Sequence, residues 1–282
     1  MKVLCVVMIL LVAVSCTVVD TVDVALDPYK QTASEALDVI NSYGSVDSVP
    51  FDGESITVAS WNLQVFGKTK AANSVVMDFY DVKLSPYDII FVQEIRDSSG
   101  TAFDELCKLF EGYDCVLSSR DGRSQSQEQI GVIYREGIEL LSFARLPDEY
   151  DVWERSPVHA EFVVDSFYFD VYSAHLKPSD VSAELRAFSD AVNGEAGNLI
   201  VIGDLNADCG YYSGVLLLPP FTTWNWLIGF EEDTTVSGTD CAYDRIIVND
   251  EMVSSVVDYG VDSADITKEY SDHYIVWLEV AI

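Results

Sequence analysis

Seven short runs rich in valine, isoleucine, tyrosine and phenylalanine constrain the fold of this chain more than any other feature of its sequence. They span residues 56–66, 87–95, 129–135, 167–176, 198–206, 243–250 and 273–280. Runs of this length and composition are typical of β-strands, because β-branched and aromatic side chains pack well on a pleated surface. The chain is therefore expected to bury several strands in sheets.

Three stretches between these runs have the composition of helices. They cover residues 71–84, 100–112 and 179–194, and the third opens with Ser179 and Asp180 as a predicted N-cap. The sequence shows no internal repeat and no low-complexity tract. Many strands with few helices predict an α/β sandwich, in which packed sheets are flanked by helices.

Polar side chains of a particular kind stand at the ends of most of the predicted strands. They are Asn62, Glu94, His175, Asp204, Asn206, Asp244, Asp272 and His273. A single histidine at a strand end, such as His273, has an ordinary structural explanation. Six strand ends with such groups do not, because each group would cost free energy if it were buried without a partner. We therefore expect these side chains to converge on one pocket at a common edge.

The residue types of this predicted pocket indicate its chemistry. Oxygen donors without cysteine favour a hard cation such as Mg²⁺, Mn²⁺ or Ca²⁺ over zinc. A histidine that a carboxylate orients serves as a general base or a general acid. A cation and an acid–base pair together suit the hydrolysis of a phosphodiester, because the metal neutralises developing charge while the base activates water.

The charge of the chain, considered alone, argues against nucleic acid as a partner. Among 282 residues, 16 Lys and Arg against 47 Asp and Glu give a formal net charge of −31. Such a surface repels polyanions at low salt, although its field decays within about 10 Å at ~0.1 M salt. The acidic balance therefore suits an exported protein of a saline environment, where the repulsion is screened.

The first residues differ in character from the rest of the chain. Residues 1–19 begin with a lysine and an apolar stretch too short for a membrane span, which predicts a signal peptide. Cys16 follows Ala-Val-Ser, so a lipoprotein signal that leaves a lipid anchor at Cys16 is the alternative to free secretion. Residues 20–54 are polar and acidic and are expected to be a spacer. Export permits disulfide bonds among the remaining cysteines.

Eight segments carry a resemblance to a known family. They are WNLQVFGKTK, YDIIFVQEIRDS, DGRSQSQEQIGVIYR, WERSPVHAEF, SAHLKPSD, VIGDLNADC, DTTVSGTDCAYDRIIV and SDHY. In this order they resemble the deoxyribonuclease I family, which belongs to the endonuclease/exonuclease/phosphatase superfamily. GDLN and SDH are shared across the superfamily, whereas QEIRDS and CAYDRI are narrower. The resemblance implies a catalytic domain over residues 55–282 with a four-layered α/β/β/α sandwich of two packed mixed β-sheets flanked by helices.

The resemblance also implies roles for the polar strand ends. His175 with Glu128 and His273 with Asp244 match two histidine–carboxylate pairs that carry out acid–base catalysis. Two further residues, Asp204 and Asn206, match groups that bind or polarise the scissile phosphate.

Other matches imply ligands and DNA contacts. Glu94 and Asp272, with Asn62 beside them, match the ligands of a divalent cation, which implies Mg²⁺ or Mn²⁺ at the active site. Contacts with the phosphates and the minor groove of DNA are matched by Arg96, Arg123 and Arg155.

An alternating series of oxygen-bearing side chains precedes Cys241. The series is Asp233, Thr235, Ser237 and Thr239. It matches a calcium loop of the family, and alternating oxygen donors in a turn suit a structural Ca²⁺. A plain polar hairpin loop is the alternative explanation.

The family also supplies an expectation for two of the cysteines. Cys209 and Cys241 fall where the family forms its structural disulfide. Cys107 and Cys115 have no counterpart there, so they either pair with each other or both remain free.

Together these inferences predict a secreted, metal-dependent endonuclease that hydrolyses double-stranded DNA and tolerates salt. We expect DNA as its partner, no obligate protein partner and a monomeric state. One alternative is a phosphoinositide phosphatase or a sphingomyelinase-like phosphodiesterase of the same superfamily. A catalytically inactive binding module is the other.

Overall fold

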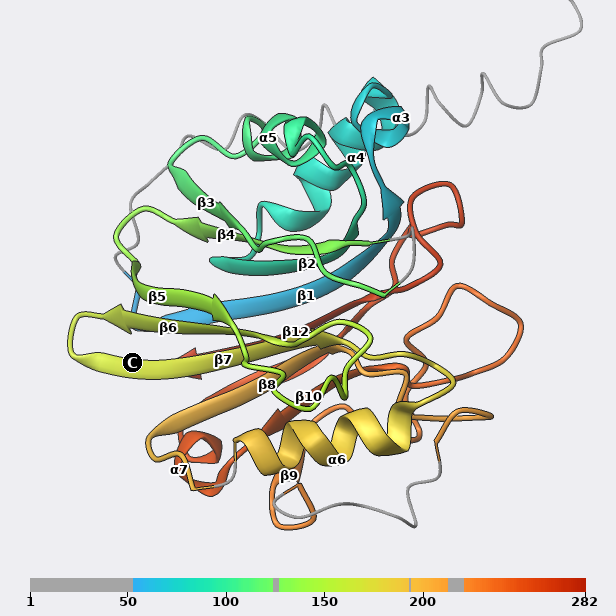
Figure 1. Ribbon diagram of the computed structural model, residues 1–282. Coiled ribbons are helices and arrows are strands. Elements are labelled where there is room, and N and C mark those ends of the chain that lie inside the picture. The colour runs from blue at the N-terminus through green and yellow to red at the C-terminus, as the bar shows by residue number, and fades with distance from the viewer. Residues whose placement is uncertain (1–52, 124–126, 193, 213–220) are drawn as a thin grey trace, which may run out of the picture. The chain divides into compact units, whose positions relative to one another are not determined.

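The computed structural model describes residues 53–123, 127–192, 194–212 and 221–282 (Figure 1). These residues all belong to the unit that comprises residues 47–282. The predicted signal peptide, the predicted anchor at Cys16 and residues 20–52 of the predicted spacer lie outside the described residues. Within the described part of the chain, no helix is long and apolar enough to cross a membrane.

Six strands form the first sheet. They are Ser55–Phe66 (β1), Ile89–Ile95 (β2), Tyr113–Leu117 (β3), Gln129–Arg135 (β4), Val256–Asp262 (β11) and Ile275–Ala281 (β12). Their order across the sheet is β11-β12-β1-β2-β4-β3. The sheet is mixed, because β1 and β2 run parallel while the other neighbours are antiparallel. The sequence predicted β1, β2, β4 and β12, whereas β3 and β11 were not predicted.

The second sheet also has six strands. They are Glu139–Arg145 (β5), Val158–Val164 (β6), Phe167–His175 (β7), Asn198–Asp204 (β8), Asn225–Trp226 (β9) and Asp244–Val248 (β10). Their order is β5-β6-β7-β8-β10-β9, and only β7 and β8 run parallel among these described strands. The sequence predicted β7, β8 and β10.

Helices cover the outer faces of both sheets (Figure 1). Lys68–Ala71 (α3), Ser74–Leu84 (α4) and Thr101–Cys107 (α5) lie on the first sheet, while Val181–Ala191 (α6) and Asp250–Val253 (α7) lie on the second. The fold is therefore the four-layered α/β/β/α sandwich that the resemblance implied. Asp180 does occupy the N-cap position of α6, but its carboxylate pairs with Lys177 at 2.9 Å instead of capping the helix.

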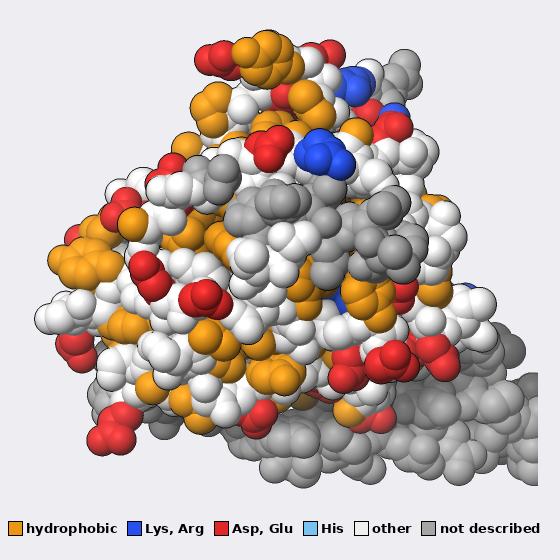
Figure 2. Space-filling view, turned by 90° about the horizontal axis from the view of Figure 1, so that it is seen from below, with side chains coloured by type: hydrophobic (Ala, Val, Ile, Leu, Met, Phe, Trp, Pro, Cys, Tyr) orange, Lys and Arg blue, Asp and Glu red, His pale blue; other side chains and the backbone are white. Residues whose placement is uncertain are grey.

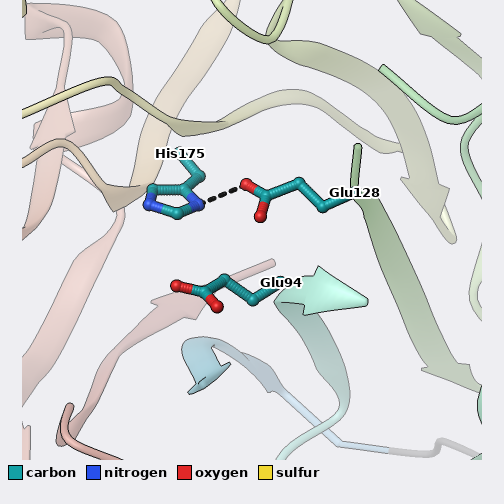
Figure 3. A group of neighbouring side chains, drawn as sticks. All are labelled: Glu94, Glu128 and His175. Carbon is teal, nitrogen blue, oxygen red and sulfur yellow. Dashed lines mark hydrogen bonds and ion pairs between the residues drawn. The ribbon is translucent and has the colours of Figure 1, made fainter. Parts of the chain in front are cut away.

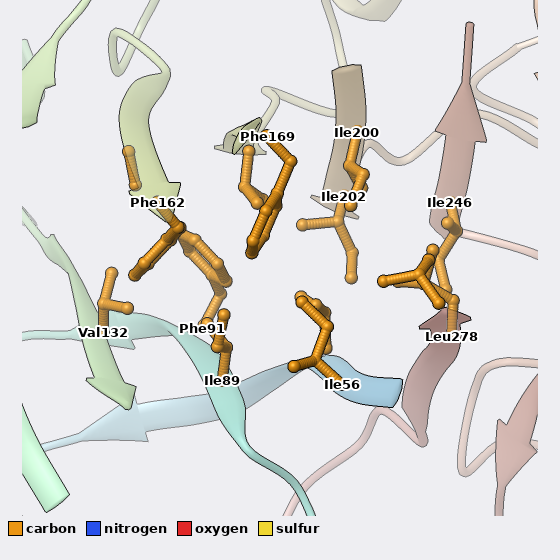
Figure 4. Close-up of a cluster of buried hydrophobic side chains, with 14 of the residues drawn as sticks. Ile56, Ile89, Phe91, Val132, Phe162, Phe169, Ile200, Ile202, Ile246 and Leu278 are labelled. Carbon is orange, nitrogen blue, oxygen red and sulfur yellow. The ribbon is translucent and has the colours of Figure 1, made fainter. Parts of the chain in front are cut away.

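The main core lies between the two sheets (Figure 4). Ile56 of β1 and Phe91 of β2 pack there with Phe169 of β7 and Ile202 of β8, and all four are buried. Two further clusters bury the opposite faces of the sheets against α4 and α5 and against α6. Because successive side chains of a strand point to opposite faces, alternate residues serve the inner and outer cores.

Candidate active site

The face of each strand that builds the main core also carries the candidate site. Along β1, Ile56 and Val58 are followed on the same face by Ser60 and Asn62, and along β7, Val171 is followed by Ser173 and then His175. At this end the interior changes from apolar to polar: the Gln93 amide donates to Ser60 at 2.8 Å and to Ser173 at 3.2 Å, which joins the two sheets. The strand period of two therefore delivers the predicted polar residues into the gap between the sheets.

A glycine fixes the relative position of two of these residues. Gly203 has φ +137°, and a Cβ atom there would lie 2.2 Å from the carbonyl oxygen of Ala174. Only glycine permits so close an approach of the β7 and β8 backbones. The approach sets the parallel register in which His175 is opposite Asp204.

The first histidine–carboxylate pair joins the end of β7 to the segment before β4. His175 Nδ1 lies 2.5 Å from Glu128 Oε1, and both side chains are buried. Two guanidinium groups share the same carboxylate, with Arg155 Nε 2.8 Å from Oε1 and Arg96 Nε 3.4 Å from Oε2. Figure 3 shows the Glu128 carboxylate directed at the imidazole, with Glu94 below them. One carboxylate therefore serves three cationic partners.

These partners decide the protonation of the first pair. Burial alone would raise the pKa of Glu128, but His175, Arg155 and Arg96 outweigh it and lower the pKa of that carboxyl group. Burial opposes protonation of His175, whereas Glu128 and Asp204 favour it, and the net effect raises the pKa of the imidazole. Arg155 acts against that rise, because its positive charge repels the protonated imidazole.

The second pair joins the start of the last strand to β10. His273 Nδ1 lies 2.7 Å from Asp244 Oδ2, and both side chains are buried. The backbone of His273 is fixed on both sides: its N–H donates to Ser271 Oγ at 3.1 Å, and its carbonyl accepts from Trp61 Nε1 at 2.8 Å. Among the described residues, no arginine forms an ion pair with Asp244.

Burial therefore has a different net effect on the carboxyl pKa of the second pair. It raises the pKa of Asp244, although the neighbouring His273 acts in the opposite direction. Burial also opposes protonation of His273, but the negative charges of Asp244, Asp204 and Asp272 outweigh it and raise the pKa of the imidazole to about 10. The pKa of both imidazoles is thus raised, and that of His273 reaches about 10.

Asp204 brings the two pairs together. Its Oδ2 lies 3.4 Å from His175 Nε2 and 3.6 Å from His273 Nε2. The Asn62 amide donates to this oxygen at 3.0 Å, and the backbone N–H of Asn206 donates to Oδ1 at 3.1 Å. Six of the predicted side chains, Asn62, Glu128, His175, Asp204, Asp244 and His273, are therefore joined in one network that crosses both sheets, and Asn206 adjoins it.

A bulge at the end of β1 positions Glu94. Asn62 pairs with Gln93 and Phe66 with Ile95, so residues 63–65 stand opposite Glu94 alone. Glu94 has φ 60°, and it faces Gln64 at φ 46° and Val65 at φ 55°. Left-handed backbone of this kind costs about 1–3 kcal/mol at each non-glycine residue. In return, the N–H of Val65 donates to Glu94 Oε2 at 2.7 Å and orients the carboxylate.

The carboxylates offer two groups of ligand atoms that fit a hard cation. Glu94, Glu128 and His175 place ligand atoms within 4.8 Å of one another, and Asp204, Asp244 and His273 form a second such group. The buried atoms Asp244 Oδ1 and Asp272 Oδ1 have no hydrogen-bond partner, and Glu128 Oε2 has only the Arg96 guanidinium, at 3.4 Å. Buried carboxylate oxygens of this kind are costly unless a cation satisfies them, so the donor set fits Mg²⁺ or Mn²⁺.

Asn62 contacts one predicted cation ligand, Glu94, and Ser271, the residue next to the other, Asp272. Its amide donates to Glu94 Oε1 at 3.3 Å, and its backbone carbonyl accepts from the hydroxyl of Ser271 at 2.5 Å. Asp272 itself is less enclosed, with Oδ1 3.7 Å from His273 Nε2. The predicted ligands thus border the same network.

The three predicted DNA contacts do not lie together. Arg96 and Arg155 both contact Glu128, and Arg96 Nη2 also lies 2.9 Å from Glu94 Oε2. Arg123 instead pairs with Asp151 at 3.1 Å, on the exposed rim, and its side chain also donates to the backbone carbonyl of that residue. Two of the three cations therefore adjoin the network directly.

The predicted calcium loop is folded on itself beside the second pair. Asp233 Oδ1 accepts from the backbone N–H of Thr235 at 3.0 Å, and the hydroxyl of Thr235 lies 3.1 Å from that of Ser237. Ser237 in turn donates to the carbonyl of Thr239 at 2.8 Å. Thr235 also forms an isolated antiparallel bridge with His273, so the loop contacts the residue of the second pair directly.

Two disulfides are present among the described residues. Cys209 and Cys241 are bonded with their Cα atoms 5.8 Å apart, which agrees with the pairing that the resemblance implied. Cys107 and Cys115, whose state the sequence left open, also form a disulfide.

Sequence reasoning missed three residues that support the site. The Lys70 ammonium donates to the carbonyls of Leu63 and Tyr270 at 2.7 and 2.6 Å, and burial lowers the pKa of Lys70 to about 8 although Asp272 and Glu94 oppose the change. Arg145 donates to Ser156 O at 2.5 Å and lies 3.4 Å from Asp121.

The third missed residue is a buried glutamate of α6. Glu184 accepts from the backbone N–H groups of Glu154 and Lys177, each at 2.7 Å, and so fixes the segments next to Arg155 and His175. A helical glutamate carries no local signal of such a role. Only the loops that reach it in space reveal it.

Comparison with known proteins agrees with this architecture. A family model described as Endonuclease/Exonuclease/phosphatase family matches residues 59–273. Deoxyribonuclease-1 of Gallus gallus is 30% identical over 229 residues, which cover 73% of this chain and 81% of the relative. Deoxyribonuclease-1 of Homo sapiens is 30% identical over 258 residues, which cover 79% and 91%.

Solved structures with low sequence identity share the fold. The structure of D. rerio TDP2 complexed with single strand DNA product has a TM-score of 0.63 at 15% identity, and the match covers 82% of this chain and 100% of that chain. A humanized D. rerio TDP2 has a TM-score of 0.65, with the same identity and coverage.

Proposed function

The chain belongs to the Endonuclease/Exonuclease/phosphatase family and, within it, to the deoxyribonuclease I family, and from this premise we propose that it is a metal-dependent endonuclease that hydrolyses double-stranded DNA. One observation carries the proposal. Asp204 Oδ2 lies within 3.6 Å of the Nε2 atoms of both imidazoles, and each imidazole is backed by its own buried carboxylate. Two oriented proton carriers on either side of one point suit a reaction that moves one proton from water and another to a leaving oxygen.

The charge environments of the two imidazoles suggest which proton each one moves. His273 is protonated at neutral pH, since its pKa is raised to about 10, and it donates a proton to the leaving oxygen. His175 is assigned the proton of the attacking water, because of the two imidazoles it is the one whose protonation a neighbouring guanidinium, that of Arg155, opposes. Asp204 and Asn206 orient the scissile phosphate between them.

Glu94, Asn62 and Asp272 would hold the divalent cation. Mg²⁺ or Mn²⁺, when bound, supplies positive charge that stabilises the developing charge on the phosphate oxygens. Arg96 and Arg155 bind phosphates of the substrate strand, and Arg123 contacts the duplex farther out on the rim. The guanidinium groups suit this role because they form forked hydrogen bonds with phosphate oxygens.

A plasmid assay tests the proposal. Purified protein is incubated with supercoiled plasmid in MgCl₂ and CaCl₂, in MnCl₂ and in chelator, alongside a phosphoinositide and a sphingomyelin substrate. We expect nicking that requires the divalent cation, with no turnover of either lipid. Turnover of a lipid without nicking would replace the proposal with the alternative phosphatase or phosphodiesterase, and no hydrolysis of any substrate would leave a binding module.

We further propose that the protein is secreted and works at raised salt as a monomer with no obligate protein partner. Residues 1–19 have the pattern of a signal peptide, and both disulfides suit an oxidising compartment. Acidic side chains are scattered over the face in Figure 2, on which few basic ones appear. Nicking is expected to persist above about 0.15 M salt, where the field of this surface is screened within ~8 Å. Loss of nicking by that concentration would contradict the salt tolerance.

Two structural features of the secreted form also remain proposals. A structural Ca²⁺ is assigned to the loop of Asp233, Thr235, Ser237 and Thr239. Lipidation at Cys16 is the alternative to free secretion, and mass spectrometry of the exported protein distinguishes the two.

A further inference from the structure

Val65 combines two properties that rarely occur together. Its backbone is left-handed, with φ 55°, and its side chain is 53% exposed. Glycine, asparagine and aspartate tolerate this backbone region, whereas a β-branched residue in it is a genuine outlier. The other left-handed non-glycine residues outside this bulge are aspartate, asparagine and cysteine, none of which is β-branched, among the residues described.

Packing within the protein does not explain the valine. A buried valine could offset its backbone strain by filling the core, but Val65 faces outward and belongs to none of the three core clusters. The hydrogen bond to Glu94 does not explain it either, because the donor is the backbone N–H, which any residue except proline would supply. What remains is a contact of the apolar side chain with something outside the chain.

The surroundings indicate the chemistry of that contact. The charged residues that line a surface pocket with Val65 are Lys68, Lys70, Arg96 and Asp97. Lys68 Nζ lies 3.7 Å from Asp97 Oδ1, and the Lys68 side chain is mostly exposed whereas that of Asp97 is buried. Three cations against one carboxylate give the pocket a positive lining beside one apolar branched side chain, which fits a ligand that alternates anionic groups with apolar rings. In a chain with a net charge of −31, a pocket with this cationic lining is unusual. The sugar–phosphate backbone of DNA has this alternation.

We propose that Val65 is a substrate-contact residue whose side chain packs against the deoxyribose next to the cleaved phosphodiester. The inference rests on the proposed nuclease function and extends it to the sugar. The bulge at residues 63–65 thus has two effects. The backbone N–H of Val65 orients Glu94 inward, and the side chain of Val65 points outward to the substrate. Bulges beside active sites redirect side chains in this way.

Substitution of Val65 separates the strain from the contact. Val65→Asn places a residue that tolerates left-handed backbone at this position, so we expect Tm to rise by about 2–4 °C. The same variant lacks the apolar contact, so KM for a duplex oligonucleotide should rise about five- to tenfold, with a smaller effect on kcat. Val65→Ile keeps a β-branched apolar side chain and should recover most of that loss, together with the lower Tm.

Val257 provides the matched control. It is 59% exposed and lies on β11 beside Val256, which pairs with Val280 at the end of β12 remote from His273. Val257→Ala should leave KM and kcat unchanged. If Val65→Asn raises Tm while KM stays at the wild-type value, or if it lowers Tm, the inference is overturned. Failure of the wild type to nick DNA would instead reject the underlying function.

Discussion

In one histidine–carboxylate pair Glu128 shares its charge among His175, Arg96 and Arg155, whereas in the other Asp244 forms its ion pair with His273 and, among the described residues, with no arginine. The hydrogen bonds within the pairs are similar, at 2.5 and 2.7 Å. The surrounding charges are not. The pKa of Glu128 is lowered, while burial raises the pKa of Asp244.

This difference shows that one motif can serve two purposes. Glu128 has several partners, since it orients the imidazole of His175 and also fixes the guanidinium groups of Arg96 and Arg155. Asp244 is dedicated to one imidazole, and its effect is to keep His273 protonated. Stability is therefore expected to depend more on the first pair, while proton transfer depends on both.

Removal of either imidazole should have the largest effect and would test directly whether both pairs take part in the reaction. We expect His175→Ala and His273→Ala each to lower kcat for plasmid nicking about 10²–10⁴-fold, because each removes one proton carrier. The double variant should lose little beyond the worse single variant, since the two act as a unit. His159→Ala is the control: His159 lies 2.5 Å from Asp170 in a similar pair that is not part of the network. Full activity of either active-site variant would contradict the assignment.

Replacement of Glu128 and of Asp244 by the corresponding amides compares how much each pair contributes to the stability of the fold. Glu128→Gln removes the buried charge that His175, Arg96 and Arg155 share and should cost about 3–5 kcal/mol of unfolding free energy. Asp244→Asn removes a charge whose burial raises its pKa, so at neutral pH the folded state loses less, about 1–2 kcal/mol. Urea unfolding at pH 7 measures both. Equal losses would mean that the arginines contribute nothing to the first pair.

Arg155 is one of the two arginines beside the first pair, and no arginine forms an ion pair with the second among the described residues. Arg155→Ala should raise KM for DNA about tenfold, because a cation bound to phosphate is lost. The slope of log KM against log salt should become shallower by about 0.9. Lys108→Ala removes the same charge from an exposed pair with Glu105 and should leave KM and the salt slope unchanged. An equal change in both variants would indicate net charge as the cause.

The loop beside the second pair should give the smallest effect. Ca²⁺ is expected to raise Tm of the wild type by about 2–5 °C, because an ion that binds only the folded state stabilises it. Asp233→Ala removes the one carboxylate among the four predicted donors, so the shift should disappear. Thermal scans with CaCl₂ and with an equal concentration of MgCl₂ test this. An unchanged shift in the variant would place the ion elsewhere.

The sequence predicted the strands that lie in the centre of the sheets more reliably than those at the edges. β2 and β8 are buried along nearly their whole length, and β1, β7 and β12 along most of theirs, so their apolar runs are long. The edge strands β5 and β11 have no fully buried residue, and polar residues such as Ser142 and Asp258 interrupt their apolar ones. Their pairing depends on a neighbour in space, which no local pattern records.

The candidate site shows the same division. Asn62, His175 and Asp204 could be predicted because polar groups interrupt apolar runs at the strand ends. The resemblance supplied the pairing of each histidine with its carboxylate. The bulge that turns Glu94 could not be predicted, since Leu63, Gln64 and Val65 continue the strand pattern without a glycine. Arg123 was grouped with Arg155 by motif, yet the structure gives it Asp151 as its partner.

The hydrogen bond from Asn62 to Asp204 has its donor in one sheet and its acceptor in the other. A slip of one layer over the other by less than an ångström would misalign reacting atoms while every strand kept its ladder intact. Turnover is consequently a more sensitive gauge of interior order than circular dichroism. On gradual heating, catalysis should fade ahead of the spectroscopic transition.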